Sequence, residues 1–295
     1  MSALDPPARG ISRRSVLLGA AAGLAAVAAG TGTAAAAPVY TPIPKLPYEV
    51  SRTDTRVSRV GKKNYECIDV VYNGDRARLY VPWATPPKAA QLVMIWFYHS
   101  NGSDHTAMDG AYAYPGMLAV DKGAVCICPD YGGSLWTTQA ALAHQATWAT
   151  YVRNALRPTV SFARANSGGG PLMTYAYATG MVPAQRGIYL ANAAYDMEDL
   201  YARDPGRIGP PYGDDPALVA ATNPARLPQS SWARKRVKTV VSLLDPLVPP
   251  AQHGVALADL ARPVAADVRV QYHDEGHVVP GWTHTDMVAT FQSWL

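Results

Sequence analysis

The segment 159–178 has the sequence TVSFARANSGGGPLMTYAYA, and the prediction of the fold starts from it. Its first five residues suit a buried strand, and its last eight form a candidate helix. Ser167 stands between them among small residues, with Ala165 two positions before it and Gly169 two positions after it. A serine at a sharp strand-to-helix turn needs small neighbours there, because the backbone is strained and crowded. The segment therefore predicts a strand, a tight turn that exposes Ser167, and a helix.

Strand-like and helix-like segments alternate on both sides of this turn. Residues 65–72 end in Asn73-Gly74, which is a hairpin signal, and residues 76–81 continue as the partner strand. Further strands are predicted over 91–98, 124–128, 187–190, 237–244 and 268–272, and further helices over 107–121, 135–156, 252–261 and 285–295. An opening hairpin followed by repeated β-α units indicates an α/β fold, with a mainly parallel central sheet and helices on both faces.

Two segments break this alternation. Residues 38–60 mix Pro, Thr, Arg and Ser without clear periodicity, which predicts an extended arm that leads into the domain. Residues 197–235 carry turn signals such as Asp204-Pro205-Gly206 and Asn223-Pro224. We expect a short irregular cap over the site there, because about forty residues are too few for an independent domain.

The N-terminus resembles a bacterial twin-arginine export signal. Arg13 and Arg14 directly precede an apolar run over residues 16–30, and small residues follow it. An uncleaved membrane anchor is the alternative, but a run of about fifteen residues is short for a bilayer span. We therefore expect residues 1–37 to be a removed signal and residues 38–295 to be a single secreted domain.

The composition excludes some function classes. With 48% hydrophobic and 16% charged residues among 295, the chain can bury a large core. Its formal net charge is +4, and half of that comes from the N-terminal segment, so too little positive charge is left to predict a nucleic-acid partner. Cys67, Cys126 and Cys128 match neither a disulfide framework nor a zinc site. The sequence contains no other metal-ligand spacing and no phosphate-binding loop, so we expect no metal and no organic cofactor.

Three residues with catalytic chemistry each follow a predicted strand. A parallel sheet places its ligand site beyond the carboxyl ends of its strands. Ser167 is one such residue, Asp245 closes an apolar segment before a Pro-rich loop, and His277 follows Gly276 just before the C-terminal helix. A serine hydroxyl needs a base that accepts its proton and a third group that orients the base. His273 is the rival base, but it lies at the edge of a predicted strand, where a structural role is expected.

In these residues and their order, the sequence resembles the α/β-hydrolase superfamily, and in particular its secreted serine esterases and lipases. The resemblance extends from about Tyr65 to Leu295. It implies that Ser167 is the nucleophile, His277 the general base and Asp245 the acid that orients the base. Ala165 stands where the family usually has the first glycine of the turn, a change that the need for a small residue permits.

The resemblance also predicts which groups stabilise negative charge on the substrate carbonyl oxygen. The backbone N–H of Gly168 is one expected donor. The second is expected from the loop after strand 91–98, where Ser100 is the first candidate and Asn101 the second. Ser100 stands where the family usually has glycine. The candidates for lining the substrate pocket are Tyr131, Trp136 and Trp282.

These residues predict a serine hydrolase that cleaves carboxylic esters through an acyl-enzyme intermediate. The expected partner is a small-molecule or polymeric ester of open acyl chain length, and no membrane span is expected in the mature chain. Two alternatives stand beside this prediction. A peptidase or amidase would use the same residues on amide bonds, and a non-catalytic binding protein of the same fold would be expected to lack a member of the triad.

Overall fold

The computed structural model of the chain describes residues 43–83 and 92–295. The predicted export signal, residues 1–37, lies outside these ranges. Among the helices within them, none combines the length and the apolarity that a bilayer crossing requires.

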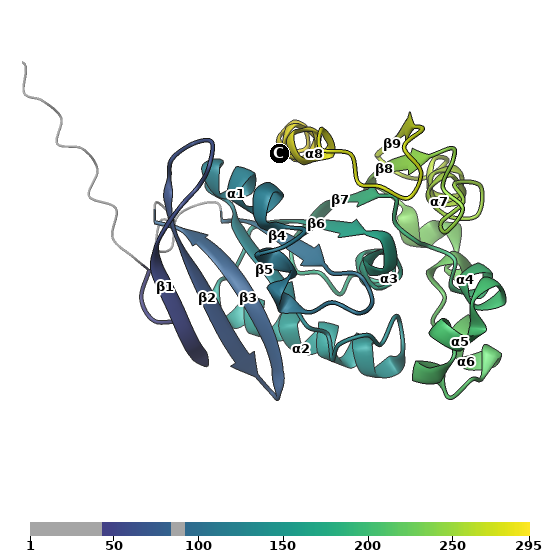
Figure 1. The fold of residues 1–295 in the computed structure, drawn as a ribbon, viewed down its shortest axis with the longest axis horizontal. Helices are drawn as coiled ribbons and strands as arrows, with labels where there is room; N and C mark the ends of the chain where they lie inside the picture. The colour runs from purple at the N-terminus through teal and green to yellow at the C-terminus, as the bar shows by residue number, and fades with distance from the viewer. Residues whose placement is uncertain (1–42, 84–91) are drawn as a thin grey trace, which may run out of the picture. The chain divides into compact units, whose positions relative to one another are not determined.

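In the described part of the chain, nine strands form one sheet in the order β1-β2-β3-β5-β4-β6-β7-β8-β9 (Figure 1). Strands β1 to β3 and β5 pair antiparallel in that order, and β5, β4 and β6 to β9 pair parallel. This sheet confirms the predicted α/β fold. The strands are β1 (Glu49–Val57), β2 (Asn64–Tyr72), β3 (Asp75–Pro82), β4 (Val93–Tyr98), β5 (Val125–Pro129), β6 (Val160–Asn166), β7 (Gln185–Ala191), β8 (Arg236–Ser242) and β9 (Asp267–His273).

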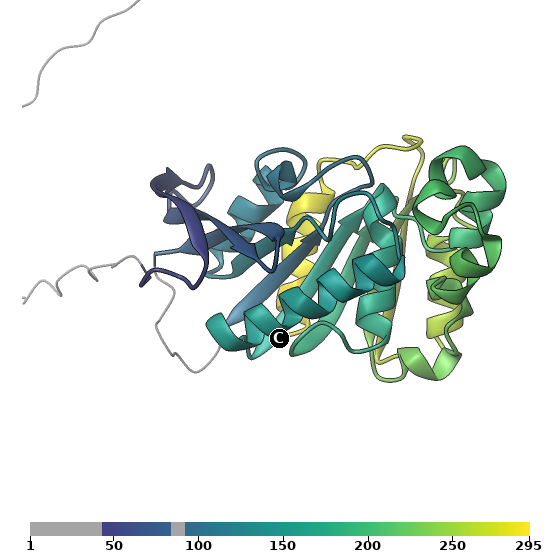
Figure 2. The ribbon, with the colours of Figure 1, turned by 90° about the horizontal axis from the view of Figure 1, so that it is seen from below.

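The helices connect these strands and cover the sheet on both sides (Figure 2). The α-helices are α1 (Ala113–Asp121), α2 (Gln139–Ala155), α3 (Gly170–Ala178), α4 (Met197–Arg203), α5 (Pro205–Ile208), α6 (Pro216–Ala221), α7 (Gly254–Ala261) and α8 (Thr283–Ser293). The short 3-10 helices are η1 (His105–Met108), η2 (Ser167–Gly169), η3 (Pro210–Tyr212), η4 (Pro224–Arg226) and η5 (Gln229–Trp232).

The sheet has a separate apolar core on each face. Helices α2, α3 and α7 pack on one face, and α1 and α8 pack on the other. Side chains of a strand alternate between the faces, so in β4 Trp96 and Tyr98 belong to the first core while Ile95 and Phe97 belong to the second. Both faces of the central strands are therefore buried, which explains their continuous apolar sequences. The three cysteines are free and buried.

The structure differs from the sequence-based expectation at the N-terminal arm. Residues 49–57 form the edge strand β1 instead of an unpaired arm, and they pair antiparallel with β2. The register shifts twice along this pair, and polar side chains dominate the strand. Irregular pairing and charged residues are common on edge strands because they prevent pairing with other chains. They also remove the apolar alternation from which a strand is predicted.

The cap segment, residues 197–235, consists largely of short helices. Its Asp-Pro and Asn-Pro pairs predict turns, but here they begin helices. The side chains of Asp204, Asp215 and Asn223 each accept a backbone N–H as an N-cap, and each is followed by proline in the first helical turn. Proline suits that position because its missing N–H would have no partner there anyway. The same dipeptides thus serve both as turns and as helix starts.

Several predicted boundaries shift by a few residues. The predicted helix 107–121 is divided into η1 and α1, and the predicted helix 135–156 begins at Gln139. The side chain of Thr138 caps that helix by accepting the backbone N–H of Ala141. The predicted strand 237–244 ends at Ser242. Of the predicted strand 91–98, residue 91 lies outside the described ranges.

Candidate active site

Ser167 lies at a strained turn between β6 and α3. Its φ of 46° is in the left-handed region, which few residues other than glycine adopt. The Ser167 N–H donates to the carbonyl of Asn192 at 3.1 Å, and its own carbonyl accepts the N–H of Ala194 at 2.9 Å, so the loop after β7 holds the turn. A Cβ on Gly169 would overlap the carbonyl oxygen of Tyr98. Close packing of the backbone therefore requires glycine at position 169.

The structure brings together Ser167, His277 and Asp245, which the sequence predicted as a set. The Oγ of Ser167 lies 2.9 Å from Nε2 of His277, and Nδ1 of His277 lies 2.7 Å from Oδ2 of Asp245. Asp245 is buried, and its Oδ1 accepts the backbone N–H groups of Leu247 and Val248 at 2.9 Å each. The carboxylate of Asp245 can accept a hydrogen bond from Nδ1–H of His277, which leaves Nε2 unprotonated and able to accept the proton of the serine hydroxyl.

The loop that carries His277 is held by Asn192, a residue that the sequence analysis did not single out. Its Nδ2 donates to the carbonyls of Gly276 and Val278, at 2.9 and 2.6 Å, on both sides of His277. Its Oδ1 lies 2.9 Å from Nε2 of His273, so this rival histidine has the structural position expected for it. Asn192 directly follows β7, and a polar residue just after a strand is the sequence feature that could have identified it. Its φ of 42° shows that it too occupies a strained turn.

Two backbone N–H groups close to Ser167 in the sequence or in space are candidates for binding the oxyanion. The backbone nitrogen of Asn101 lies 3.0 Å from the point where a Cβ of Gly168 would stand. Within residues 43–83 and 92–295, neither the N–H of Asn101 nor that of Gly168 donates a hydrogen bond. Ser100, the first candidate from the sequence, instead donates its hydroxyl to the carbonyl of Asn166 at 3.1 Å. The geometry thus brings the N–H of Asn101, the second candidate, next to that of Gly168.

A small pocket adjoins these donors. Asn101, Gly168 and Leu172 line it together with Tyr131 and Trp136, two of the three predicted pocket residues. The Tyr131 ring stacks on that of Tyr98, with ring centroids 4.9 Å apart. The third candidate, Trp282, does not line this pocket. It precedes α8 and packs against the core on the α1 and α8 side of the sheet.

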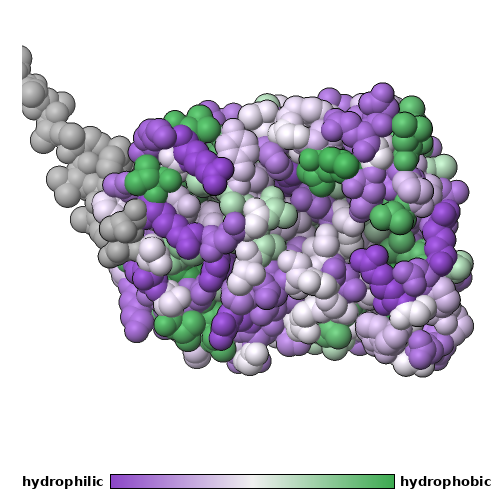
Figure 3. Space-filling view, in the orientation of Figure 1, coloured by the Kyte–Doolittle hydropathy of each residue, from purple (hydrophilic) through white to green (hydrophobic). Residues whose placement is uncertain are grey.

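Exposed apolar side chains lie along the loops of Asp245 and His277. Three leucines flank Asp245 in the sequence, at positions 243, 244 and 247, and Val278 follows His277. The side chain of each of these four residues is about half exposed or more. Figure 3 shows hydrophobic residues on one face of the molecule as several small clusters separated by hydrophilic residues. The loops on the His277 side of the site are therefore exposed and partly apolar, whereas Trp136, on the side of the pocket, is buried.

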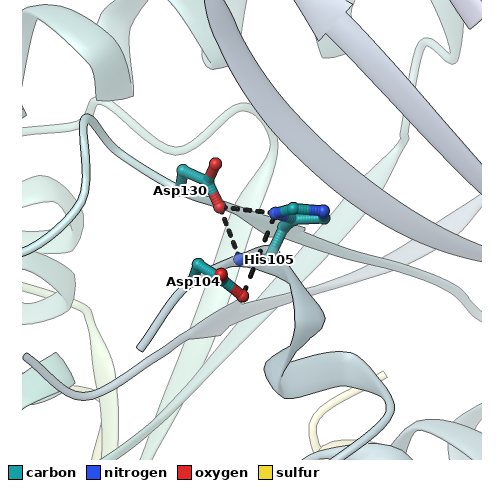
Figure 4. Close-up of side chains that lie close together, drawn as sticks. All are labelled: Asp104, His105 and Asp130. Atoms are coloured by element: carbon teal, nitrogen blue, oxygen red, sulfur yellow. Dashed lines mark hydrogen bonds and ion pairs between the residues drawn. The ribbon is translucent and has the colours of Figure 1, made fainter. Parts of the chain in front are cut away.

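Asp104, His105 and Asp130 form another group of polar side chains, with potential metal-ligand atoms within 4.8 Å of one another (Figure 4). Oδ1 of Asp130 accepts the backbone N–H of His105 and lies 2.8 Å from its Nδ1. Asp104 accepts the N–H of Thr106 at 2.7 Å, and hydrogen bonds from Thr106 lower the pKa of Asp104. The bonds of Asp130 thus connect the loop after β5 to η1, and Asp104 caps the N-terminus of η1.

Solved structures of several hydrolases are similar to this chain, whereas no protein-family model and no curated protein sequence matches it. The bifunctional GH43-CE protein of Bacteroides eggerthii has a TM-score of 0.60 at 12% identity, over 82% of this chain and 38% of that one. The acetyl xylan esterase of Paenibacillus sp. R4 has a TM-score of 0.60 at 12% identity, over 83% of this chain and 88% of that one. The acylaminoacyl peptidase of Pyrococcus horikoshii has a TM-score of 0.56 at 12% identity, over 85% of this chain and 42% of that one.

This chain has the α/β-hydrolase fold. It spans about two fifths of the length of the Bacteroides protein and of the peptidase, and most of the length of the xylan esterase. At these identities, the similarity establishes the arrangement of strands and helices and leaves the activity to be argued from the site.

Proposed function

We propose that this protein is a serine hydrolase that cleaves small-molecule or polymeric carboxylic esters. The observation that carries the proposal is the hydrogen-bonded chain from Ser167 Oγ through His277 to Asp245, with distances of 2.9 and 2.7 Å. These three residues belong to separate segments of the sequence and meet at the carboxyl ends of β6, β8 and β9. The names of similar structures, among them an acetyl xylan esterase, agree with this activity.

The reaction begins with attack of Ser167 on the ester carbonyl. As Oγ bonds to the carbonyl carbon, Nε2 of His277 takes the hydroxyl proton, and Asp245 stabilises the imidazolium that forms. The carbonyl oxygen becomes an oxyanion, which the N–H groups of Gly168 and Asn101 meet. The intermediate collapses as the C–O bond to the alcohol breaks, and the proton on His277 passes to the departing oxygen. An acyl group then remains on Ser167.

Water completes the cycle by the same steps. His277 takes a proton from a water molecule, and the water oxygen attacks the acyl carbon. The second tetrahedral intermediate releases the carboxylic acid and returns the proton to Ser167. Every proton is exchanged between Ser167, His277, water and the alcohol, so the cycle closes without a metal or an organic cofactor.

A peptidase acting on amides is the second candidate, because the fold is shared with an acylaminoacyl peptidase. The chain covers 42% of that peptidase, and its own cap segment is short. A panel of nitrophenyl esters and amino-acid anilides separates the two candidates. We expect ester turnover with little or no anilide turnover, and turnover of anilides alone would contradict the proposal.

A non-catalytic binding protein of this fold is the third candidate. A fluorophosphonate reacts with a serine only when a neighbouring base activates it, so labelling of the folded protein distinguishes this candidate from an enzyme. Covalent labelling is expected for an enzyme, and an unlabelled folded protein would favour the binding protein.

We also propose that the protein acts outside the cytoplasm, exported through the twin-arginine pathway. The proposal rests on Arg13 and Arg14 before the apolar run of residues 16–30. Replacing both arginines with lysine is expected to retain the protein in the cytoplasm, while N-terminal sequencing of the exported protein should begin near Pro38. Export of the lysine variant at the normal rate would contradict the proposal.

A further inference from the structure

The small pocket beside Ser167 lies away from the catalytic base. Its lining residues come largely from the end of β4 and the loop after it, the loop after β5 and the start of α3. They include Gly168, which follows Ser167, but none of Ser167, Asp245 and His277. Both proposed oxyanion donors, Asn101 and Gly168, belong to this lining. The pocket therefore lies beside the proposed oxyanion donors, and the proton-transfer groups lie outside its lining.

This placement assigns the pocket to one half of the substrate. The departing alcohol must receive its proton from Nε2 of His277, so the alcohol lies on the His277 side. The acyl group stays bonded to Ser167 after the alcohol has left, with its carbonyl oxygen at the N–H groups of Gly168 and Asn101. The remaining substituent of the carbonyl carbon then points into this pocket.

The pocket holds only a small group. The space open to the centre of a water-sized sphere is about 20 Å³, whereas roughly 10–15 Å³ is needed for one water molecule. The six-membered ring of Trp136 limits this space. Its Cζ3 and Cη2 atoms lie 3.1 and 3.3 Å from the point where a Cβ of Gly168 would stand. This space suits a group of about the size of a methyl, and we expect a longer chain to meet the indole ring of Trp136.

Trp136 is held in this position by the cap segment. Its backbone has a φ of 52°, a strained value that must be stabilised by neighbours. The next residue, Thr137, provides the anchor, because its backbone N–H donates to the hydroxyl of Tyr212 at 3.0 Å and its own hydroxyl lies 2.8 Å from the same oxygen. The indole ring packs in a buried apolar cluster with Met197, Ile208, Tyr212 and Val219 of the cap segment.

We propose that this esterase is selective for very short acyl groups, above all acetyl, because the cap segment holds Trp136 across the acyl pocket. The inference rests on the proposed function, since it concerns the acyl half of that substrate. The alcohol half lies on the open side, next to the exposed leucines of the Asp245 loop, and is not restricted by Trp136.

The first test is the acyl-length profile of the wild-type protein. The second-order rate constant kcat/KM is measured with the nitrophenyl esters of acetate, butyrate and octanoate. One methylene group in a tight pocket changes the rate by about 10–200-fold, so butyrate is expected to react at least about tenfold more slowly than acetate. Equal or faster turnover of butyrate contradicts this inference alone. Absence of turnover with all three esters contradicts the proposed function itself.

The second test enlarges the pocket. Trp136→Leu is expected to raise the butyrate-to-acetate ratio of kcat/KM by at least about tenfold, because it removes the ring that limits the chain. Trp232→Leu is the matched control, since Trp232 is also a buried tryptophan without a hydrogen-bond partner at Nε1 but does not line the pocket. Both variants lose core packing, yet only Trp136→Leu should change the ratio. A changed ratio in the control, or an unchanged ratio in Trp136→Leu, overturns the inference.

The third test concerns the anchor. Tyr212→Phe removes only the hydroxyl that binds Thr137 and keeps the apolar cluster. It should relax the acyl preference in the same direction as Trp136→Leu but by less, while the rate of Ser167 labelling by a small fluorophosphonate stays within about twofold. This variant remains informative even if Trp136→Leu does not fold. An unaltered acyl preference in Tyr212→Phe shows that the cap segment does not control the pocket.

Discussion

Replacing Asn192 with alanine tests how His277, the proposed general base, is held in place. Asn192 makes three side-chain hydrogen bonds, to the carbonyls of Gly276 and Val278 at 2.9 and 2.6 Å and with His273 at 2.9 Å. At about 1 kcal/mol for each bond, the change removes about 3 kcal/mol from the ordered loop. Since 1.4 kcal/mol corresponds to a factor of ten, kcat can fall by up to about 100-fold.

The assay separates positioning from general stability. For Asn192→Ala, kcat on nitrophenyl acetate should fall while KM stays within about threefold, because the loop orients the base and does not bind the ester. Labelling of Ser167 by fluorophosphonate should slow by a similar factor, since it also needs His277. Asn223→Ala is the control, because Asn223 is an equally buried asparagine with several hydrogen bonds in the cap segment. The reasoning is refuted if both variants lose similar stability and Asn192→Ala keeps the kcat of the wild type.

Three further variants test separate parts of the account. Asp245→Asn should lower kcat by roughly 10³–10⁴-fold with little change in melting temperature, because an amide in that place favours the wrong tautomer of the base; a drop below tenfold contradicts this role. Gly169→Ala should destabilise the protein strongly in chemical denaturation, because its Cβ overlaps the carbonyl of Tyr98, and wild-type stability would show that the turn can shift. Partial burial raises the pKa of Asp109, but hydrogen bonds from Arg56 and Tyr80 and the charges of Arg56 and Arg78 together lower it more, so the net shift is downward. The ionised carboxylate of Asp109 therefore stabilises the fold above about pH 4, the ordinary range for Asp, and this stabilisation is lost as the pH falls through the folded-state pKa. Asp109→Asn should lower the melting temperature at pH 7 and make the melting temperature fall less on acidification. An unchanged dependence of the melting temperature on pH would refute this.

Local sequence signals were sufficient for the catalytic candidates. Ser167, Asp245 and His277 each follow an apolar strand, and parallel strands bring their carboxyl ends to one edge of the sheet. The small residues around Ser167 are required by contacts within a few ångströms, so they are visible in a short sequence window. For these residues, strand order and turn chemistry determine the position.

Other features depend on contacts between segments that are distant in the sequence. Asn192 binds a loop more than eighty residues away, and no pattern around it indicates that partner. The choice between Ser100 and Asn101 depends on the path of one loop, in which the hydroxyl of Ser100 binds the carbonyl of Asn166. Trp136 is likewise fixed by Tyr212, through Thr137, across the cap segment.

Mass spectrometry of the fluorophosphonate-labelled protein tests the central claim, that Ser167 is the activated nucleophile. The account predicts one adduct per chain, located on Ser167, with ester turnover lost in proportion to labelling. In Ser167→Ala, both the adduct and the turnover should be absent while the melting temperature stays close to that of the wild type. An adduct on another residue, or full ester turnover in Ser167→Ala, would contradict the account.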